Sequence, residues 1–312
     1  MPTHRGSPPS GCRTTAGEWV VALEATNVAV KRCTFCGRVL HPTRVKFAGK
    51  TGEDIVPRWL MDHLSIRRLP INPIRVSAAS RQIIDIRYHH LDSLLAPVCA
   101  ACNNGWMSKL ESTTKPILTR LIADPYRLGE LTPEEKLVIA RWTFKTAAAL
   151  NRASTHGKPA NVDARPVPDG HIRKIARGEL PEDAIVVGGG YSSNKLFDWL
   201  QFSVWAAPKN GIPLSASDRE RSYKIALCIG DLILAVAFYP SPEYRYGAIE
   251  GYHVPLWEGR RPLLLVNDFV DTSPTVSGCL SAERFIRNIF VVSSTWVELV
   301  TNVSTTRLIS AS

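Results

Sequence analysis

Two pairs of cysteines share the same C-x-x-C spacing in this chain: Cys33 with Cys36, and Cys99 with Cys102. The side chains of two cysteines at this spacing project from the same tight turn, so each pair can supply two thiolates to a single tetrahedral ion. A closed set of four thiolates leaves no coordination position for water, which favours a structural role over a catalytic one. We therefore expect these four cysteines to hold one structural Zn²⁺ ion that organises the N-terminal third of the protein.

The alternative interpretation is two unrelated pairs, redox-active or buried. The 62 residues between the pairs, from Gly37 to Val98, exceed the spacing of common zinc ribbons. A disulfide framework is not expected from seven cysteines in a cytosolic chain, because the cytosol keeps thiols reduced. The remaining cysteines stand alone; Cys228 and Cys279 lie in apolar surroundings that predict buried packing.

Hydropathy predicts a cytoplasmic protein that does not enter a membrane. The longest apolar stretch, from Ile225 to Tyr239, is broken at Gly230-Asp231 and is too short to span a bilayer. The first residues contain no apolar core followed by a cleavage site, as a secretory signal would.

Positive charge is concentrated in the part of the chain that carries the paired cysteines. Residues 1–124 contain 17 Lys and Arg against 9 Asp and Glu, whereas residues 125–312 contain 21 against 19. Lysine and arginine neutralise phosphates and release condensed counterions, so a nucleic-acid partner is one natural interpretation. A solvated basic surface without a specific partner is the other.

Helix-boundary residues predict the longest helix in the chain. Leu131 to Glu135 is a helix start, with threonine at the N-cap, proline in the first turn and two acids after it. Apolar residues at helical spacing extend this helix to about Asn151. Its expected buried face consists of Leu137, Ala140, Phe144 and Ala147, widened by Val138 and Trp142.

The second cysteine pair should open another helix that runs towards Leu110. Pro116 should interrupt or restart it, because proline lacks the N–H of a helical hydrogen bond, and a further helical segment should end before Pro125. Shorter helices are expected at 57–64 and 171–178.

Strands are expected at 82–91 and from Ala184 onward. Lys224–Phe238 predicts a hairpin that turns at Gly230-Asp231, and strand-like runs follow at 262–269 and 285–300. The segment 18–30 suits a strand or a short helix.

The sequence therefore predicts an α+β fold with a zinc module, a helical connector and a strand-rich C-terminal domain. The expected boundaries are a disordered tail at 1–28, the zinc module at 29–124, the connector at 125–152 and the C-terminal domain at 153–312.

The order of motifs resembles the HNH endonucleases, in particular an actinobacterial branch. The resemblance covers roughly residues 31–152 and rests on the first C-x-x-C, the segment GEDIVPRWL and the segment VCAACNNGWMSKLE. It implies a ββα-metal fold in which a zinc-bearing treble clef holds a small nuclease site. Carried over by position, Glu53 and Asn103 match the ligands of a catalytic Mg²⁺ or Mn²⁺ ion, and Asp54 stands where the family has its histidine base.

The aspartate at this position changes the expected chemistry. A histidine with a pKa near 6.5 exchanges protons at neutral pH, whereas an aspartate near 3.9 is a weaker base. Asp54 is therefore an impaired base, a second metal ligand or a mark of lost activity. His63, His89 and His90 are the candidates to restore a base, although each alone fits a surface or packing position.

The leading hypothesis from the sequence is a metal-dependent endonuclease of the HNH type that hydrolyses double-stranded DNA. The alternatives are a catalytically inactive, zinc-stabilised nucleic-acid-binding module and a zinc-stapled interaction protein. The sequence does not determine the oligomeric state.

Overall fold

The computed structural model describes residues 31–40, 53–70, 74–76, 83–85, 90–155, 158–159, 167–191, 196–202, 217, 221–266, 285–286 and 288–293. All of them belong to the unit Lys31–Ser312. The predicted tail at 1–28, the segment 18–30, Cys12, Cys279 and His89 lie outside the described residues. The fold is α+β with a strand-rich C-terminal region, as the sequence predicts.

Short elements surround the cysteine pairs. They are β1 (Glu53–Asp54), α1 (Arg58–His63), β2 (Ile74–Val76), β3 (Ile83–Asp85), η2 (Leu91–Ser93), β4 (Leu95–Ala96), α2 (Ala100–Cys102) and η3 (Asn103–Met107). Two long helices follow, α3 (Ser108–Ala123) and α4 (Pro133–Asn151), joined by η4 (Pro125–Glu130). The strands β5 (Ser154–Thr155) and β6 (Lys158–Pro159) and the helix α5 (Asp169–Ala176) lead into the C-terminal region. The short helices predicted at 57–64 and 171–178 are confirmed as α1 and α5.

The C-terminal region forms most of a seven-stranded sheet with the order β12-β7-β10-β9-β8-β2-β3. Its strands from this region are β7 (Ala184–Gly190), β8 (Phe197–Phe202), β9 (Tyr223–Ile229), β10 (Leu232–Phe238) and β12 (Val254–Trp257). The predicted hairpin is confirmed, because β9 and β10 pair in antiparallel fashion around a turn at Gly230, whose φ of 56° suits glycine. β11 (Tyr244–Ile249), β13 (Leu264–Val266) and β14 (Phe290–Ser293) form a separate sheet, and β1, β4, β5 and β6 form a third.

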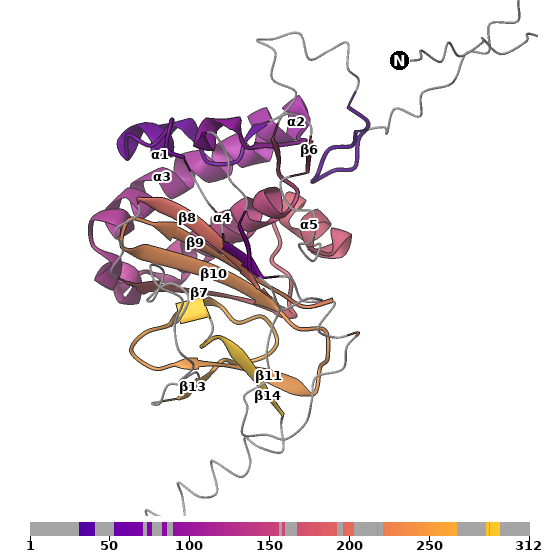
Figure 1. Ribbon diagram of the computed structural model, residues 1–312. Coiled ribbons are helices and arrows are strands. Elements are labelled where there is room, and N and C mark those ends of the chain that lie inside the picture. Colours follow the sequence, from indigo (N-terminus) through magenta and orange to yellow (C-terminus); the bar gives the residue numbers. More distant parts are fainter. Residues whose placement is uncertain are drawn as a thin grey trace, which may run out of the picture. The chain divides into compact units, whose positions relative to one another are not determined.

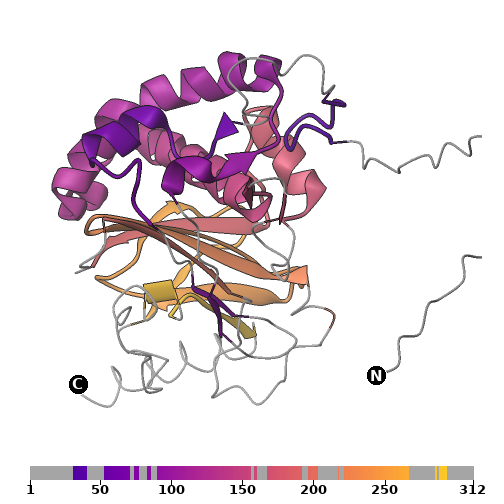
Figure 2. The same cartoon turned by 45° about the horizontal axis from the view of Figure 1, so that its top comes forward.

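The large sheet is covered on both faces, which explains the continuous apolar runs of its central strands. In β10, Leu234 and Val236 pack into the core that contains α4, whereas Ile233 and Ala235 pack with β11 and its neighbours. Figure 1 shows α3 and α4 on one side of β7–β10, with β11, β13 and β14 on the other. The same layers are visible after rotation in Figure 2.

Helix α4 begins at the predicted position and is buried more completely than an amphipathic stripe implies. Its N-terminus has a capping box, in which Thr132 and Glu135 each accept a hydrogen bond from the other's backbone N–H. Every residue from Trp142 to Asn151 is buried, because α3, α5 and four strands contact this helix. The prediction for Leu137 is wrong: it is 41% exposed, since the helix enters the core only at Ile139.

The predicted break at Pro116 is also wrong, because α3 runs without interruption from Ser108 to Ala123. Pro116 lies on the exposed side of the helix, where the hydrogen bond that it cannot donate is compensated by solvent. The opposite side of α3 is buried at Ile117, Leu118 and Leu121, and this packing holds the helix together through the proline. The helix ends before Pro125, as predicted.

Glycines in β7 allow two layers to approach the strand closely. A Cβ atom at Gly189 would overlap the ring of Phe285 and the carbonyl oxygen of Tyr252. A Cβ atom at Gly188 would press against Leu128 of η4 on the other face. These glycines therefore serve close packing rather than an unusual backbone conformation.

No helix among the described residues has both the length and the apolar character that a membrane crossing requires.

A buried ion pair joins the two long helices. Lys145 of α4 is 1% exposed, and its Nζ lies 2.8 Å from Oε1 of Glu111 in α3, whose side chain is 22% exposed. An ammonium group at this depth depends on its partner, because an unpaired buried charge is far more costly than a paired one.

We expect Glu111→Ala to lower the free energy of unfolding by about 3 kcal/mol, because it leaves the Lys145 ammonium buried and unpaired. The matched control is Arg127→Ala, which removes a pair with Asp124 whose two side chains are each 47% exposed and should cost under about 1 kcal/mol. Urea denaturation followed by circular dichroism measures both changes. Equal effects of the two substitutions would contradict the importance of the buried pair.

Candidate metal centre

The first cysteine pair lies in a tight turn closed by backbone hydrogen bonds. The N–H of Gly37 donates to the carbonyl of Cys33 at 2.9 Å, and the N–H of Cys33 donates to the carbonyl of Arg38 at 2.8 Å. Gly37 has a φ of 72°, a conformation that glycine adopts without strain. A bridge between Arg32 and Val39 continues the turn into a short hairpin. This geometry turns the side chains of Cys33 and Cys36 to the same side.

The second pair lies at the start of a helical segment that begins just after β4. Cys99 is the residue before α2, and Cys102 ends it. The N–H of Asn103 donates to the carbonyl of Cys99 at 3.0 Å, which closes the first turn around the pair. The chain then passes through the π-helical turn η3 into α3, so the second pair is attached to a long helix.

The two pairs meet and are held together by the backbone as well as by their thiols. The N–H of Thr34 donates to the carbonyl of Pro97 at 2.7 Å, and the N–H of Cys99 donates to Sγ of Cys33 at 3.3 Å. Hydrogen bonds from backbone N–H groups to sulfur stabilise a negative charge on the sulfur.

The four sulfur atoms fit a tetrahedral metal ion. All four Sγ atoms lie within 4.8 Å of one another, and those of Cys36 and Cys99 are 3.6 Å apart. With metal–sulfur distances of about 2.3 Å, the edges of a tetrahedron are about 3.8 Å long. Cys33, Cys99 and Cys102 are buried, while Cys36 is exposed. The predicted grouping of these four residues is confirmed, and the cluster can hold a metal ion.

The pKa values of the cluster are spread apart by burial and by hydrogen bonds within it. Burial raises the pKa of Cys33 and, together with the charge of Cys33, that of Cys102. Burial also opposes ionisation of Cys99, but hydrogen bonds from the backbone of Cys102 and from the neighbouring thiols lower its pKa to about 7. Metal binding replaces the thiol protons, because only thiolates are strong ligands.

Aromatic side chains enclose the cluster. Phe35, between the first two cysteines, meets Trp106 edge to face at a centroid distance of 5.2 Å. Trp106 and Trp59 are partly buried against the core, so both contribute to packing. Lys115 lies 5.7 Å from the centroid of the Trp59 ring, a cation–π contact.

The predicted acidic positions lie on β1, which pairs with the strand that leads to the second cysteine pair. Glu53 is opposite Ala96 and Asp54 is opposite Leu95 in the antiparallel β1–β4 pair. The description of Glu53 extends to its backbone only. Asp54 is 8% exposed, and its Oδ2 accepts a hydrogen bond from Nε of Arg58 at 2.9 Å.

The remaining predicted site residues are dispersed. Asn103 is half-buried at the start of η3, directly after the cluster. His63 is exposed at the end of α1, and the ring of the exposed His90 lies 3.1 Å from the carbonyl oxygen of Arg68. His89 lies outside the described residues. The structure thus brings the four cysteines together and puts Asn103 beside them, whereas His63 and His90 occupy surface positions.

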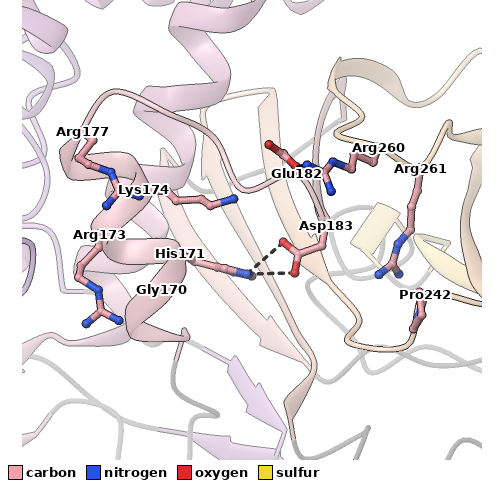
Figure 3. Close-up of a pocket in the computed structure, with 10 residues that line it drawn as sticks. All are labelled: Gly170, His171, Arg173, Lys174, Arg177, Glu182, Asp183, Pro242, Arg260 and Arg261. Atoms are coloured by element: carbon pink, nitrogen blue, oxygen red, sulfur yellow. Dashed lines mark hydrogen bonds and ion pairs between the residues drawn. The ribbon is translucent and has the colours of Figure 1, made fainter.

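A second group of polar side chains, which the sequence analysis did not identify, lines a cavity beside α5 (Figure 3). It contains His171, Asp183 and several arginines from segments far apart in the chain. The local sequence offers one weak signal for it, the cationic run HIRKIAR at 171–177.

Comparisons of the chain with protein-family models, with curated proteins and with solved structures gave no match.

We expect the purified chain to hold one metal ion, and Cys99→Ser to lose it. The matched control is Cys228→Ala, which removes a buried cysteine outside the cluster and should retain the ion. Elemental analysis gives the identity and amount of metal, and Co²⁺ substitution should produce the visible absorption of a tetrahedral thiolate site. A folded chain without metal, or equal loss in both variants, would contradict a metal centre at these cysteines.

Proposed function

We propose that this chain is a zinc-stabilised nucleic-acid-binding protein built on the scaffold of the HNH endonucleases. The observation that carries the proposal is the group of four Sγ atoms within 4.8 Å, which joins a cysteine turn to a helix start. The order of elements supports a ββα arrangement of the treble-clef type: a cysteine turn, the antiparallel pair β1–β4, and a helix that begins at the second cysteine pair.

Zinc is the proposed ion because a closed set of four thiolates is its usual structural site. The surrounding elements are short, since β1 and β4 have two residues each and α2 has three. Strands of this length have little stability of their own. Metal binding would therefore contribute directly to the folding of this part of the chain.

The charge distribution supports nucleic acid as the partner. Most of the surplus of basic residues lies within residues 1–124. Exposed cationic side chains of this segment include Lys31, Arg32, Arg38, Arg58, Arg68, Lys109 and Lys115. Contacts from such side chains to phosphates release counterions, which makes binding strong at low salt and weak at high salt.

The environment of Asp54 favours binding over hydrolysis. A general base must reach a water molecule and must take up a proton near neutral pH. The Asp54 side chain is 8% exposed and its Oδ2 accepts a hydrogen bond from Nε of Arg58, which limits the access of a water molecule to this carboxylate. This ion pair links β1 to the first turn of α1, so it has a structural role that does not require catalysis.

Hydrolysis of DNA is a second candidate function, because two residues near the cysteine cluster could bind a catalytic metal ion. Asn103 follows directly after the last cysteine, and Glu53 lies on the strand that pairs with β4. Oxygen atoms of these side chains would suit Mg²⁺ or Mn²⁺. Such an ion, when bound, would stabilise the charge that develops on the phosphate.

Binding of the full chain to duplex DNA should weaken steeply with salt and depend on the cationic surface of the zinc module. We expect the triple substitution of Arg32, Arg38 and Lys109 by Gln to reduce affinity about tenfold or more and to flatten the salt dependence. The matched control substitutes Arg127, Lys136 and Arg245, three basic residues outside the module. Fluorescence anisotropy with a labelled duplex measures both. Equal weakening, or no binding by the native chain, would favour an interaction protein without a nucleic-acid partner.

The Asp54→His substitution separates binding from hydrolysis. It introduces a base with a pKa suited to neutral pH, so we expect metal-dependent nicking of plasmid DNA to appear or rise at least tenfold. Asp54→Asn is the matched control, because it also removes the carboxylate but supplies no base. Efficient cleavage by the native chain that is lost in Glu53→Ala and Asn103→Ala, with metal content at the cysteines unchanged, would overturn the binding proposal in favour of the endonuclease.

A further inference from the structure

A cavity of about 700 Å³ lies beside α5 and shares no residue with the cysteine cluster. Its walls come from α5, the turn before β7, the loop after β10 and the loop after β12. Its lining residues are Gly170, His171, Arg173, Lys174, Arg177, Glu182, Asp183, Pro242, Arg260 and Arg261. This volume lies within the range of small-molecule sites.

The lining is strongly cationic, because four arginines and one lysine face two carboxylates. Arg260 pairs with Glu182, and Arg177 lies 3.5 Å from Glu179. Within the described part of the chain, the side chains of Arg173 and Lys174 have no hydrogen bond or ion pair. Figure 3 shows Lys174 extending from α5 across the cavity towards the side that carries Asp183. Two cations without counter-charges in a concave site attract an anion.

Arg261 is held in place on the opposite wall. Its Nη1 donates to the carbonyl oxygens of Ser241 at 2.8 Å and Tyr239 at 3.1 Å, and its guanidinium lies 5.9 Å from the centroid of the Tyr246 ring. A guanidinium that is already fixed loses little conformational entropy when a ligand binds. The cavity therefore has a rigid cation on one wall and two adaptable ones on the other.

A chain of hydrogen bonds ends at a carboxylate in this cavity. The Nε2 atom of the buried His171 lies 3.1 Å from Oδ1 of Asp183, and Nδ1 lies 2.9 Å from the hydroxyl of Tyr223. A carboxylate only accepts hydrogen bonds, so Nε2 donates to Asp183. The Nδ1 atom and the Tyr223 hydroxyl share the other hydrogen bond, in which the donor depends on whether Nδ1 carries a proton. His171 thus positions Asp183 and has no ring nitrogen left for a ligand.

Asp183 is ionised and accessible. Burial alone would raise the pKa of its carboxyl, but the hydrogen bond and charge of His171 outweigh burial, and the pKa lies below its usual value. The side chain is 45% exposed, so its oxygens can accept hydrogen bonds from a ligand. A negative group in a cationic cavity disfavours a simple anion and favours a ligand that carries hydrogen-bond donors as well as negative charge.

We propose that this cavity binds a sugar phosphate, with the phosphate group held by Lys174 and the sugar hydroxyls donating to Asp183. Carboxylates are common partners of ribose hydroxyls in nucleotide sites, for the same reason of donor and acceptor chemistry. The sugar phosphate can come from two sources, a free small molecule or the 5′-phosphorylated end of a nucleic acid. The proposal does not depend on the metal centre or on the proposed function.

Isothermal titration calorimetry of the full chain with ribose 5-phosphate tests the proposal. We expect saturable binding of one ligand per chain, with inorganic phosphate and ribose each binding at least tenfold more weakly. Lys174→Ala should weaken ribose 5-phosphate binding about tenfold, whereas Lys109→Ala, which removes an exposed lysine of α3, should leave it unchanged. Absence of saturable binding, or equal effects of the two substitutions, would overturn the proposal.

Asp183→Asn separates a sugar phosphate site from a simple anion site. The substitution removes a negative charge, so inorganic phosphate should bind as well as before or more tightly, whereas the preference for ribose 5-phosphate should fall at least fivefold. If the affinities for ribose 5-phosphate and for inorganic phosphate fall by the same factor, with an unchanged circular dichroism spectrum, Asp183 does not recognise the hydroxyls.

Short oligonucleotides with and without a 5′-phosphate identify the source. If the 5′-phosphate increases affinity and Lys174→Ala abolishes that increase, the site accepts a nucleic-acid end. If the 5′-phosphate has no effect while ribose 5-phosphate binds, the site is one for free small molecules. Both results support the sugar phosphate proposal, and failure of both ligands to bind refutes it while leaving the zinc and DNA-binding experiments untouched.

Discussion

Helix α4 has no exposed face along its second half, and both candidate sites are positioned by elements that pack against it. Its residues from Trp142 to Asn151 are all buried. α3, which continues from the cysteine-bearing helix start, contacts it on one side, while α5 and strands of the large sheet contact it on others. The three consecutive alanines at 147–149 keep this part of the helix slender, so its neighbours can approach closely. A change in α4 would therefore disturb the cysteine cluster and the cavity beside α5 together.

The cysteine cluster resolves a local problem of stability. The hairpin around Cys33 and the helix start at Cys99 are far apart in the sequence, and closing the chain between them costs conformational entropy. Two hydrogen bonds that join them are that of the Thr34 N–H to the carbonyl of Pro97 and that of the Cys99 N–H to Sγ of Cys33. Four thiolates at this spacing would repel one another. A bound cation attracts all four and so links the two segments. The four cysteines therefore require a cation once they are ionised, and they also supply its ligands.

Short-range sequence patterns predicted most of the helices and strands. The predictions that were wrong are those in which tertiary contacts outweigh the local pattern. The capping box at Thr132, the turn at Gly230-Asp231 and the paired cysteines are short-range patterns, and all three were interpreted correctly. Pro116 and Leu137 were misjudged because packing on α3 overrides a lost hydrogen bond, and because the first turns of α4 lie outside the core. The predicted domain boundaries stay predictions, although one core cluster includes residues from Cys33 to Leu256.

The cavity beside α5 had no comparable signal in the sequence. His171, Asp183, Tyr223 and Arg261 come from four separate segments, and only the pairing of β7, β9 and β10 with the docking of α5 brings them together. A short cationic run such as HIRKIAR fits a solvated helix face equally well until the opposite wall is known.

Two aspartates show how exposure and partner decide what a carboxylate can do. Asp54 was the residue that sequence reasoning placed in a catalytic role, yet it is 8% exposed and held by Arg58 from its own neighbouring helix. Asp183 drew no attention in the sequence, yet its side chain is 45% exposed, ionised and oriented by a buried histidine. The partner of Asp183 stabilises its charged form, so this carboxylate is not suited to take up a proton at neutral pH. The two aspartates differ in access, because the Asp54 side chain is 8% exposed whereas the Asp183 side chain is 45% exposed. Recognition by accepting hydrogen bonds is therefore the chemistry available to Asp183, and structural cohesion between β1 and α1 is that of Asp54.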